Sequence, residues 1–302
     1  MITIRVAPTS ANLGPGFDCL AVTLDLGDVC METSFEEGCK GIIVIPQGWG
    51  QETLPQDRSN LVARAFAHFA SMNSLPLPAG LNIHTSNGIP IGSGLGSSAA
   101  AIVSGLLAAR EYYNTSCSME EIANMAFALE GHADNTTAAL LGGLVVLTVQ
   151  DETVVYRRYT AARLPVVLVR PEFNLSTRAA RQALPKQVPF KNAVSSVGNT
   201  ALLVDALQTG DMDLLGKVYR DTLHQPYRLP LIPGAAQAAQ AGLDAGAAAV
   251  VLSGAGPSLL TFAPHKQEEV AIAMQEGFAK AGLQSQAFFG WTADKPAQVL
   301  VT

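Results

Sequence analysis

Hydrophobic and polar residues alternate at the start of the chain, where Ile2, Ile4 and Val6 are separated by polar residues. A two-residue period of this kind predicts a β-strand with one buried face. Short apolar runs bounded by turn-forming residues predict further strands in both halves of the chain, at 21–26, 42–45, 81–85, 144–149, 166–169, 248–252, 259–262 and 286–291.

Other segments repeat their apolar residues every three to four positions, which is the period of an amphipathic helix. One such helix is predicted to begin at Ser59 or Asn60. Another begins at Ser118, because Ser118 and Glu121 have the spacing of a capping box, and Gly131 is a natural stop for it. The remaining helices are predicted near 98–112, 177–184, 194–208, 213–222, 235–245 and 268–281.

The chain has 302 residues, which is enough for one large domain or two smaller ones. A soft boundary near 151–164 predicts two domains, residues 1–155 and 156–302. Hydrophobic residues make up 48% of the sequence and charged residues 15%, a composition typical of a globular protein. The formal net charge of -6 and the absence of any Lys/Arg run disfavour a nucleic-acid partner.

The sequence also bears on the compartment. The longest apolar stretch, 138–149, is too short to span a bilayer, and the first residues lack the pattern of a signal peptide. None of the four cysteines forms a C-x-x-C pair, which favours free thiols in a reducing compartment. We therefore expect a cytoplasmic protein with no membrane partner. The cysteines are Cys19, Cys30, Cys39 and Cys117.

The most informative stretch is the glycine-rich loop 90–100, Pro-Ile-Gly-Ser-Gly-Leu-Gly-Ser-Ser-Ala-Ala, which precedes a predicted helix. Glycines let backbone N–H groups converge on an anion, and the helix N-terminus adds positive charge. The hydroxyls of Ser97 and Ser98 can bind phosphate oxygens or Mg²⁺. The loop lacks the lysine of a Walker A motif and matches poorly the glycine spacing of a dinucleotide fingerprint, and the G-x-S-x-G elbow of a hydrolase occurs nowhere in the chain. A flexible turn before a helix remains the alternative.

This loop resembles the phosphate loop of GHMP kinases, P-x-x-x-G-L-G-S-S-A. Stretches 8–18 and 253–258 are similar to the first and third motifs of that superfamily, and they occur in the right order. Because the three motifs span nearly the whole chain, it is identified as a member of the superfamily. Membership implies an α+β fold, with a ribosomal-protein-S5-like N-terminal domain that binds ATP. It also implies a ferredoxin-like C-terminal domain whose third motif packs against the phosphate loop.

Further details resemble the homoserine kinase branch of the superfamily. They are the form S-A-N-L-G-P-G-F-D of the first motif and the segments 130–135, 176–181 and 224–228. The pair Thr136-Thr137 departs from the branch, and we expect it to affect packing rather than chemistry. The resemblance implies ATP-dependent phosphorylation of the side-chain hydroxyl of L-homoserine to O-phospho-L-homoserine, a step of threonine biosynthesis. Homodimers are common in the superfamily, so a homodimer is a further expectation.

The resemblance also implies roles for individual residues. Catalytic roles fall to Ser98, Asp134 and Thr177, and the Mg²⁺ ligands are Ser98 and Glu130. The amino-acid substrate, whose carboxylate suits the planar guanidinium of arginine, is expected at Asn12, Asp18, His132, Asn135, Arg181 and Arg228. ATP is expected at Pro90, Ile91, Gly92, Ser93, Gly94, Leu95, Gly96, Ser97, Ser98, Ala99, Ala100, Asn60, Val62, Gly254 and Gly256.

Several alternatives stay open at this point. Glu121 is explained by the capping box, but Asn124 lies where some members of the superfamily place an acidic metal ligand. Asp134 either takes the hydroxyl proton or orients the substrate while that proton leaves through the phosphate. The whole chain could also be a GHMP kinase for another acceptor, or a nucleotide-binding sensor that no longer transfers phosphate.

Overall fold

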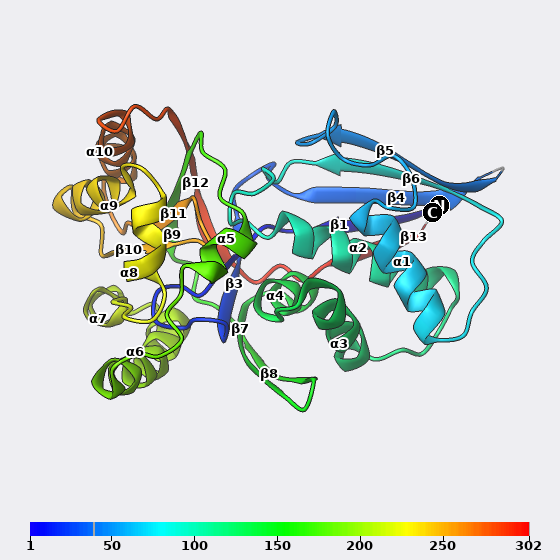
Figure 1. Cartoon of the computed structure of the whole chain (residues 1–302), viewed down its shortest axis with the longest axis horizontal. Helices are drawn as coiled ribbons and strands as arrows, with labels where there is room; N and C mark the ends of the chain where they lie inside the picture. Colours follow the sequence, from blue (N-terminus) through cyan, green and yellow to red (C-terminus); the bar gives the residue numbers. More distant parts are fainter. Residues whose placement is uncertain (39, 302) are drawn as a thin grey trace.

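The computed structural model describes residues 1–38 and 40–301, so Cys39 lies outside the described residues. The described part forms two β-sheets with helices packed against them (Figure 1). Cys19, Cys30 and Cys117 have free thiols, as predicted. No helix in the described part is long and apolar enough to cross a membrane.

The first sheet has five strands and is covered by helices on one face (Figure 1). Strand β4 shows the reason, because Met31, Thr33 and Phe35 are buried whereas Glu32 and Glu36 are exposed. Strands β5 and β6 are parallel, and the other neighbours are antiparallel. The strand order is β13 (Gln298–Val301), β1 (Ile2–Val6), β4 (Met31–Glu37), β6 (Gly80–Asn87) and β5 (Gly41–Gly48).

Helices of the first half pack beneath this sheet. Phe66 of the first helix lies against Phe35 of the sheet, with ring centroids 6.1 Å apart. Gly105 lets the first two helices come close, because a Cβ there would lie 2.3 Å from the carbonyl oxygen of Val62. The helices are α1 (Leu61–Met72), α2 (Ser97–Tyr112), α3 (Met119–Glu130) and α4 (Asp134–Leu141).

The second sheet is buried on both faces along its interior strand β9. Val167 and Val169 face one apolar cluster, and Val166 and Leu168 face the other. All neighbouring strands are antiparallel. The order is β10 (Ala249–Leu252), β11 (Leu259–Phe262), β9 (Pro165–Pro171), β12 (Ser285–Ala293), β3 (Leu20–Asp25), β7 (Leu144–Gln150) and β8 (Thr153–Tyr159), with β2 (Thr9–Ala11) paired to β3.

Helices of the second half surround that sheet in two groups. Helices α9 and α10 cover the face that carries Val167, with Met274 and Phe278 in the same cluster. Leu203 and Leu215, from α6 and α7, join the cluster on the other side. The helices are α5 (Thr177–Gln182), α6 (Phe190–Thr209), α7 (Met212–Val218), α8 (Gln225–Arg228) with the 3-10 turn η1 (Leu229–Leu231), α9 (Ala235–Asp244) and α10 (Gln267–Ala279).

The predicted helix signals are confirmed. Asn60 caps α1, Ser118 and Glu121 form a reciprocal capping box on α3, and Gly131 ends α3 with a φ of 82°. Helix α4 was not predicted, because nearly all its residues are buried and it therefore shows no amphipathic period. Helix α8 and strands β2, β4, β8 and β13 were also missed; β2 lies in a stretch whose turn-forming residues had predicted a loop.

Both sheets contain strands from both halves of the chain. Strand β13 pairs with β1 in the first sheet, and β12 pairs with β3 in the second. The predicted boundary after residue 155 falls inside β8. The division into domains 1–155 and 156–302 therefore stays a prediction.

Candidate active site

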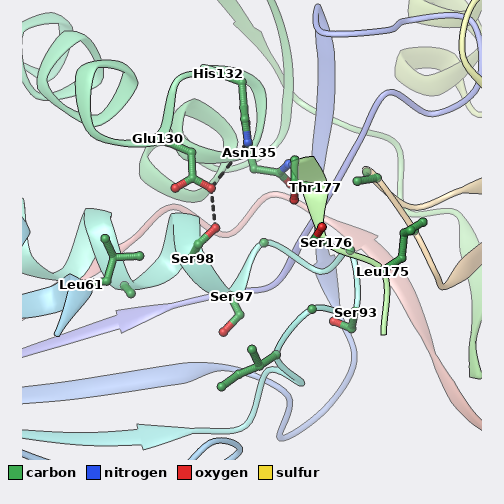
Figure 2. A pocket seen from close by; sticks show the side chains of 18 of the residues that line it. Leu61, Ser93, Ser97, Ser98, Glu130, His132, Asn135, Leu175, Ser176 and Thr177 are labelled. Atoms are coloured by element: carbon green, nitrogen blue, oxygen red, sulfur yellow. Dashed lines mark hydrogen bonds and ion pairs between the residues drawn. The ribbon is translucent and has the colours of Figure 1, made fainter. Parts of the chain in front are cut away.

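A cavity of about 430 Å³ is lined by residues of every motif that the sequence singled out. Figure 2 shows part of this lining, including Ser93, Glu130 and Thr177. Most predicted site residues line the cavity: Asn12, Asp18, Asn60, Val62, Ile91, Gly92, Ser93, Gly94, Gly96, Ser97, Ser98, Glu130, His132, Asp134, Asn135, Thr177, Arg181, Arg228, Gly254 and Gly256. Four predicted residues are buried behind the wall instead, namely Pro90, Leu95, Ala99 and Ala100. Their side chains support the loop from behind.

The glycine loop is held in place by hydrogen bonds to both neighbouring motifs. The backbone N–H of Thr9 donates to the carbonyl oxygen of Leu95 at 3.1 Å, and the hydroxyl of Ser253 donates to that of Gly94 at 2.7 Å. Gly94 has a φ of 82°, and a Cβ there would lie 2.1 Å from the carbonyl oxygen of Ser253. Only glycine fits this position.

The N-terminus of α2 is open toward the cavity. Its N-cap residue is Gly96, so no side chain caps the helix and the first backbone N–H groups remain available. Ser97 and Ser98 stand in this first turn and line the cavity. An uncapped N-terminus of a 16-residue helix next to a glycine loop is suited to bind phosphate groups.

The first and third motifs are joined by further hydrogen bonds. The side-chain amide of Asn12 donates to the carbonyl oxygen of Gly254 at 2.8 Å, and its oxygen accepts from the backbone N–H of Asp18 at 2.9 Å. The hydroxyl of Thr9 donates to Asn135 at 2.8 Å. Asn12 therefore holds the loops together, while its predicted contact with the substrate stays a prediction.

Ser98 and Glu130 meet at the wall between α2 and the end of α3. Figure 2 shows the two side chains directed toward each other, with the hydroxyl of Ser98 donating to Glu130, whereas Ser97 points elsewhere. The alternative acid position, Asn124, accepts a hydrogen bond from the backbone of Val154 and does not line the cavity. Of the residues weighed from the sequence, Glu130 is thus the one placed beside Ser98.

This arrangement fits a magnesium ion that is carried mainly by a nucleotide. A hydroxyl and a carboxylate are hard oxygen ligands, and Mg²⁺ usually takes only one or two protein ligands alongside phosphate oxygens and water. Within the described residues, no group of three or more His, Cys, Asp or Glu side chains could hold a metal ion. The oxygens of Ser98 and Glu130 are the protein ligands that this corner of the cavity offers.

His132 lies between two carboxylates. Its Nδ1 is 3.1 Å from Oδ1 of Asp134, and its Nε2 is 3.6 Å from Oε1 of Glu130. Burial opposes the charged imidazole, but the hydrogen bond with Asp134 and the charges of Asp134 and Glu130 raise the pKa of His132 above its usual value. Asp134 is only 3% exposed, and its Oδ1 also accepts the backbone N–H of Asn135 at 2.7 Å.

The two arginines of the site differ in their partners. Arg181 forms a bidentate ion pair with Asp18, with both N–O distances at 2.9 Å, and this hydrogen bonding raises the pKa of Arg181. Arg228 is 2% exposed, and it forms no ion pair with any described residue. Burial, and then the nearby charge of Arg181, lower the pKa of Arg228. Among the described residues, Arg228 is therefore a buried cation without an ion-pair partner.

The cavity wall also includes the start of α1 and the ends of β4 and β6, with apolar residues such as Leu61 and Met31. Asn60 caps α1 by accepting from the backbone N–H of Val62 at 3.0 Å, so its side chain is used within the fold. Sequence reasoning missed several lining residues here, because they belong to no motif: Met31, Leu54, Thr85, Asn87 and Ala101. Asn87 is also close to the phosphate loop, because its amide donates to the hydroxyl of Ser97 at 3.4 Å.

The family description "GHMP kinases N terminal domain" matches residues 60–143, and "GHMP kinases C terminal" matches residues 203–280, together more than half of the chain. The chain belongs to the GHMP kinase family. The α+β fold of this family, predicted from the motifs, is confirmed.

Relatives narrow the comparison within the GHMP kinases. A homoserine kinase of Moorella thermoacetica is 43% identical over 94% of this chain and 95% of its own length. A homoserine kinase of Gloeobacter violaceus is 43% identical over 85% of this chain and 86% of its own length. The predicted resemblance to the homoserine kinase branch is confirmed.

Solved structures agree with this placement. The crystal structure of a homoserine kinase from Cytophaga hutchinsonii aligns with a TM-score of 0.87 and 28% identity, over 99% of this chain and 97% of that chain. A mevalonate kinase from L. major aligns with a TM-score of 0.70 and 19% identity, over 97% of this chain and 95% of that one. The second likeness concerns the fold alone.

Proposed function

We propose that this GHMP kinase transfers the terminal phosphoryl group of ATP to the side-chain hydroxyl of L-homoserine and so forms O-phospho-L-homoserine for threonine biosynthesis. One observation carries the choice of acceptor. A buried arginine without an anion, Arg228, and the Asp18–Arg181 pair line the same cavity as the open N-terminus of α2. An acceptor with one carboxylate, one ammonium group and one hydroxyl matches these charges.

We place ATP along the glycine loop. Its phosphates would accept hydrogen bonds from the free N–H groups of the first turn of α2, and its base would lie against the apolar residues Leu61 and Ile91. Ser98 and Glu130 would hold Mg²⁺, which offsets the negative charge of the phosphates. Phosphoryl transfer depends mainly on position and charge stabilisation, and these elements supply both.

The amino-acid end of homoserine is placed at the two arginines. Its carboxylate would bind Arg228, which forms no ion pair with a described residue, with Arg181 beside it. Its ammonium group would bind Asp18, which in the free protein is paired with Arg181. His132 and Asn135 also line the cavity, and they would fix the orientation of the carbon chain of homoserine between its amino-acid end and its hydroxyl.

Asp134 and Thr177 are the candidates nearest to the chemistry. Oδ1 of Asp134 accepts hydrogen bonds from His132 and from the backbone of Asn135, which fixes the carboxylate and leaves Oδ2 for the substrate hydroxyl. Thr177 begins α5, is exposed and lines the cavity (Figure 2). In this arrangement Asp134 orients the hydroxyl toward the terminal phosphate and accepts its proton or passes it to the phosphate.

The acceptor is tested by measuring ADP release with Mg-ATP. L-Homoserine is compared with L-threonine, L-serine, mevalonate, galactose and shikimate at matched concentrations. Turnover selective for L-homoserine supports the proposal. Turnover with another compound keeps the phosphate site and rejects the acceptor, and ATP binding without turnover points to a sensor.

A homodimer and a cytoplasmic location are part of the proposal. On the outer face of α6, Phe190, Val194 and Val197 are 84%, 55% and 72% exposed. If two copies pair these helices in antiparallel fashion about Gly198, Lys191 of each copy faces Asp205 of the other, because both lie equally far from that glycine. Sedimentation should show a dimer that Val197→Glu dissociates; an unchanged sedimentation rate would reject this surface. The free thiols agree with a reducing compartment.

A further inference from the structure

His224 lies directly behind Arg228 and is fully buried. It does not line the cavity, so any influence on a bound molecule passes through another residue. Its Nε2 is 2.8 Å from the carbonyl oxygen of Gly14, and its Nδ1 is 3.4 Å from Nη1 of Arg228. The two ring nitrogens thus contact two different elements of the site.

Chemistry fixes the tautomer of this imidazole. A carbonyl oxygen can only accept a hydrogen bond, so Nε2 must carry the proton that it donates to Gly14. A guanidinium can only donate, so Nδ1 must present a lone pair to Arg228. Both contacts require the same neutral form, with the proton on Nε2.

The surroundings keep His224 neutral. Burial lowers the pKa of His224, and the positive charge of Arg228 lowers it further. Asp221 favours the charged form, since its Oδ2 is 3.4 Å from Nε2. That oxygen, however, accepts hydrogen bonds from the backbone N–H groups of His224 at 2.9 Å and Gln225 at 2.6 Å, so its negative charge is already stabilised by other donors. Burial and the charge of Arg228 together outweigh Asp221, so the pKa of His224 is lowered and its imidazole is neutral.

The guanidinium of Arg228 is held on several sides. Its centre lies 5.0 Å from the ring of Phe17, which itself stacks on His224 at 5.1 Å with an interplanar angle of 25°. Nε donates to the carbonyl oxygen of Ala180 and Nη1 to that of Gly254, both at 3.3 Å. No hydrogen bond from Nη2 to a described residue is seen, and Arg228 lines the cavity.

We propose that His224 is a positioning residue that accepts a hydrogen bond from Arg228 through Nδ1 and so aims the guanidinium at the carboxylate of the amino-acid substrate. Phe17 forms the second support of the same guanidinium. The inference rests on the proposed function, because it needs a substrate with a carboxylate. It adds that the orientation of Arg228 is set by a group outside the cavity.

Two substitutions separate the two ring nitrogens. In His224→Asn the amide oxygen takes the place of Nδ1, so the acceptor for Arg228 is kept and the bond to Gly14 is lost. In His224→Gln the amide reaches the place of Nε2, so the bond to Gly14 is kept and the acceptor is lost. We expect His224→Gln to raise the KM for L-homoserine by about tenfold, the effect of one hydrogen bond to a charged group. His224→Asn should raise it clearly less, and the KM for ATP should stay within about twofold of wild type in both.

A double-mutant cycle with Arg228→Lys completes the test. If His224 acts through Arg228, His224→Gln adds little to the KM in the Arg228→Lys background, whereas a purely structural role gives additive effects. Should His224→Gln fail to fold by circular dichroism, the same cycle with His224→Phe, which keeps an aromatic ring against Phe17 but also removes the acceptor, decides. Equal KM increases in the two variants, or additive effects, overturn the proposal. If the wild type does not turn over homoserine, the proposed function is rejected as well. If the wild type does turn over homoserine and only Arg228→Lys raises the KM, the role of His224 alone is rejected.

Discussion

Replacing Arg228 by methionine tests substrate binding and folding stability separately, because we expect this residue to contribute much to the binding of a carboxylate and little to the free energy of unfolding. Its three hydrogen bonds to neutral groups are long, at 3.3 to 3.4 Å. Each contributes about 1.5 kcal/mol, the low end for a charged donor, and the buried charge costs several kcal/mol in lost solvation, so the two effects nearly cancel. Methionine has a similar length and adapts to irregular space. We therefore expect the free energy of unfolding to change by ~1 kcal/mol or less.

The effect on the amino-acid substrate should be much larger. Removing one partner of a buried, hydrogen-bonded charge pair costs about 2–5 kcal/mol of binding. That cost corresponds to a KM for L-homoserine that is roughly thirtyfold to several thousandfold higher, since 1.4 kcal/mol is about tenfold. The KM for ATP should change little, because in the proposed complex the phosphates bind at the N-terminus of α2 and not at Arg228.

Urea unfolding and steady-state kinetics on the same preparations measure both quantities. Arg181→Met is the matched control, because that arginine is paired with Asp18 and its loss leaves a carboxylate without its partner. A variant Arg228→Met that unfolds several kcal/mol more easily, with an unchanged KM for L-homoserine, would show that Arg228 serves the fold. That result would refute its role in binding a carboxylate.

Three further predictions follow from individual contacts. Gly94→Ala should raise the KM for ATP at least about tenfold, because its Cβ would lie 2.1 Å from the carbonyl oxygen of Ser253; a KM equal to wild type in ADP-release kinetics would show that the loop adapts. Asp134→Asn should lower kcat by about a hundredfold or more with smaller changes in both KM values, and an unchanged kcat would remove Asp134 from the chemistry. Burial raises the pKa of the Cys19 thiol to about 11, so iodoacetamide should modify Cys19 slowly at pH 8 and faster only as the pH approaches that value; rapid labelling at pH 8 in mass spectra would contradict this burial.

Much of the site could be predicted because its residues lie in short, ordered motifs. The third motif was expected to pack against the glycine loop, and the hydrogen bond from Ser253 to Gly94 joins them. The choice of Glu130 over Asn124 was open in the sequence. In the structure, α3 places Glu130 beside Ser98, whereas Asn124 lies beside β8.

Other features could not be read from the sequence, because they depend on which partner each side chain finds. Arg181 and Arg228 look alike in their motifs, yet one is paired with Asp18 and the other is buried without an anion. His224 gave no sign that its ring supports Arg228 from behind. In the fold, β13 was missed because most of its residues are exposed at a sheet edge, and only the pairing with β1 defines it.

The central claim is that the hydroxyl of L-homoserine receives the terminal phosphoryl group of ATP. The most direct measurement is ³¹P NMR of a reaction that contains the full chain, Mg-ATP and L-homoserine, with the product isolated and its mass determined. The account predicts a phosphomonoester on the homoserine side chain that accumulates in proportion to ADP. ADP formed together with inorganic phosphate alone, or ATP left unchanged in the presence of L-homoserine, would contradict it.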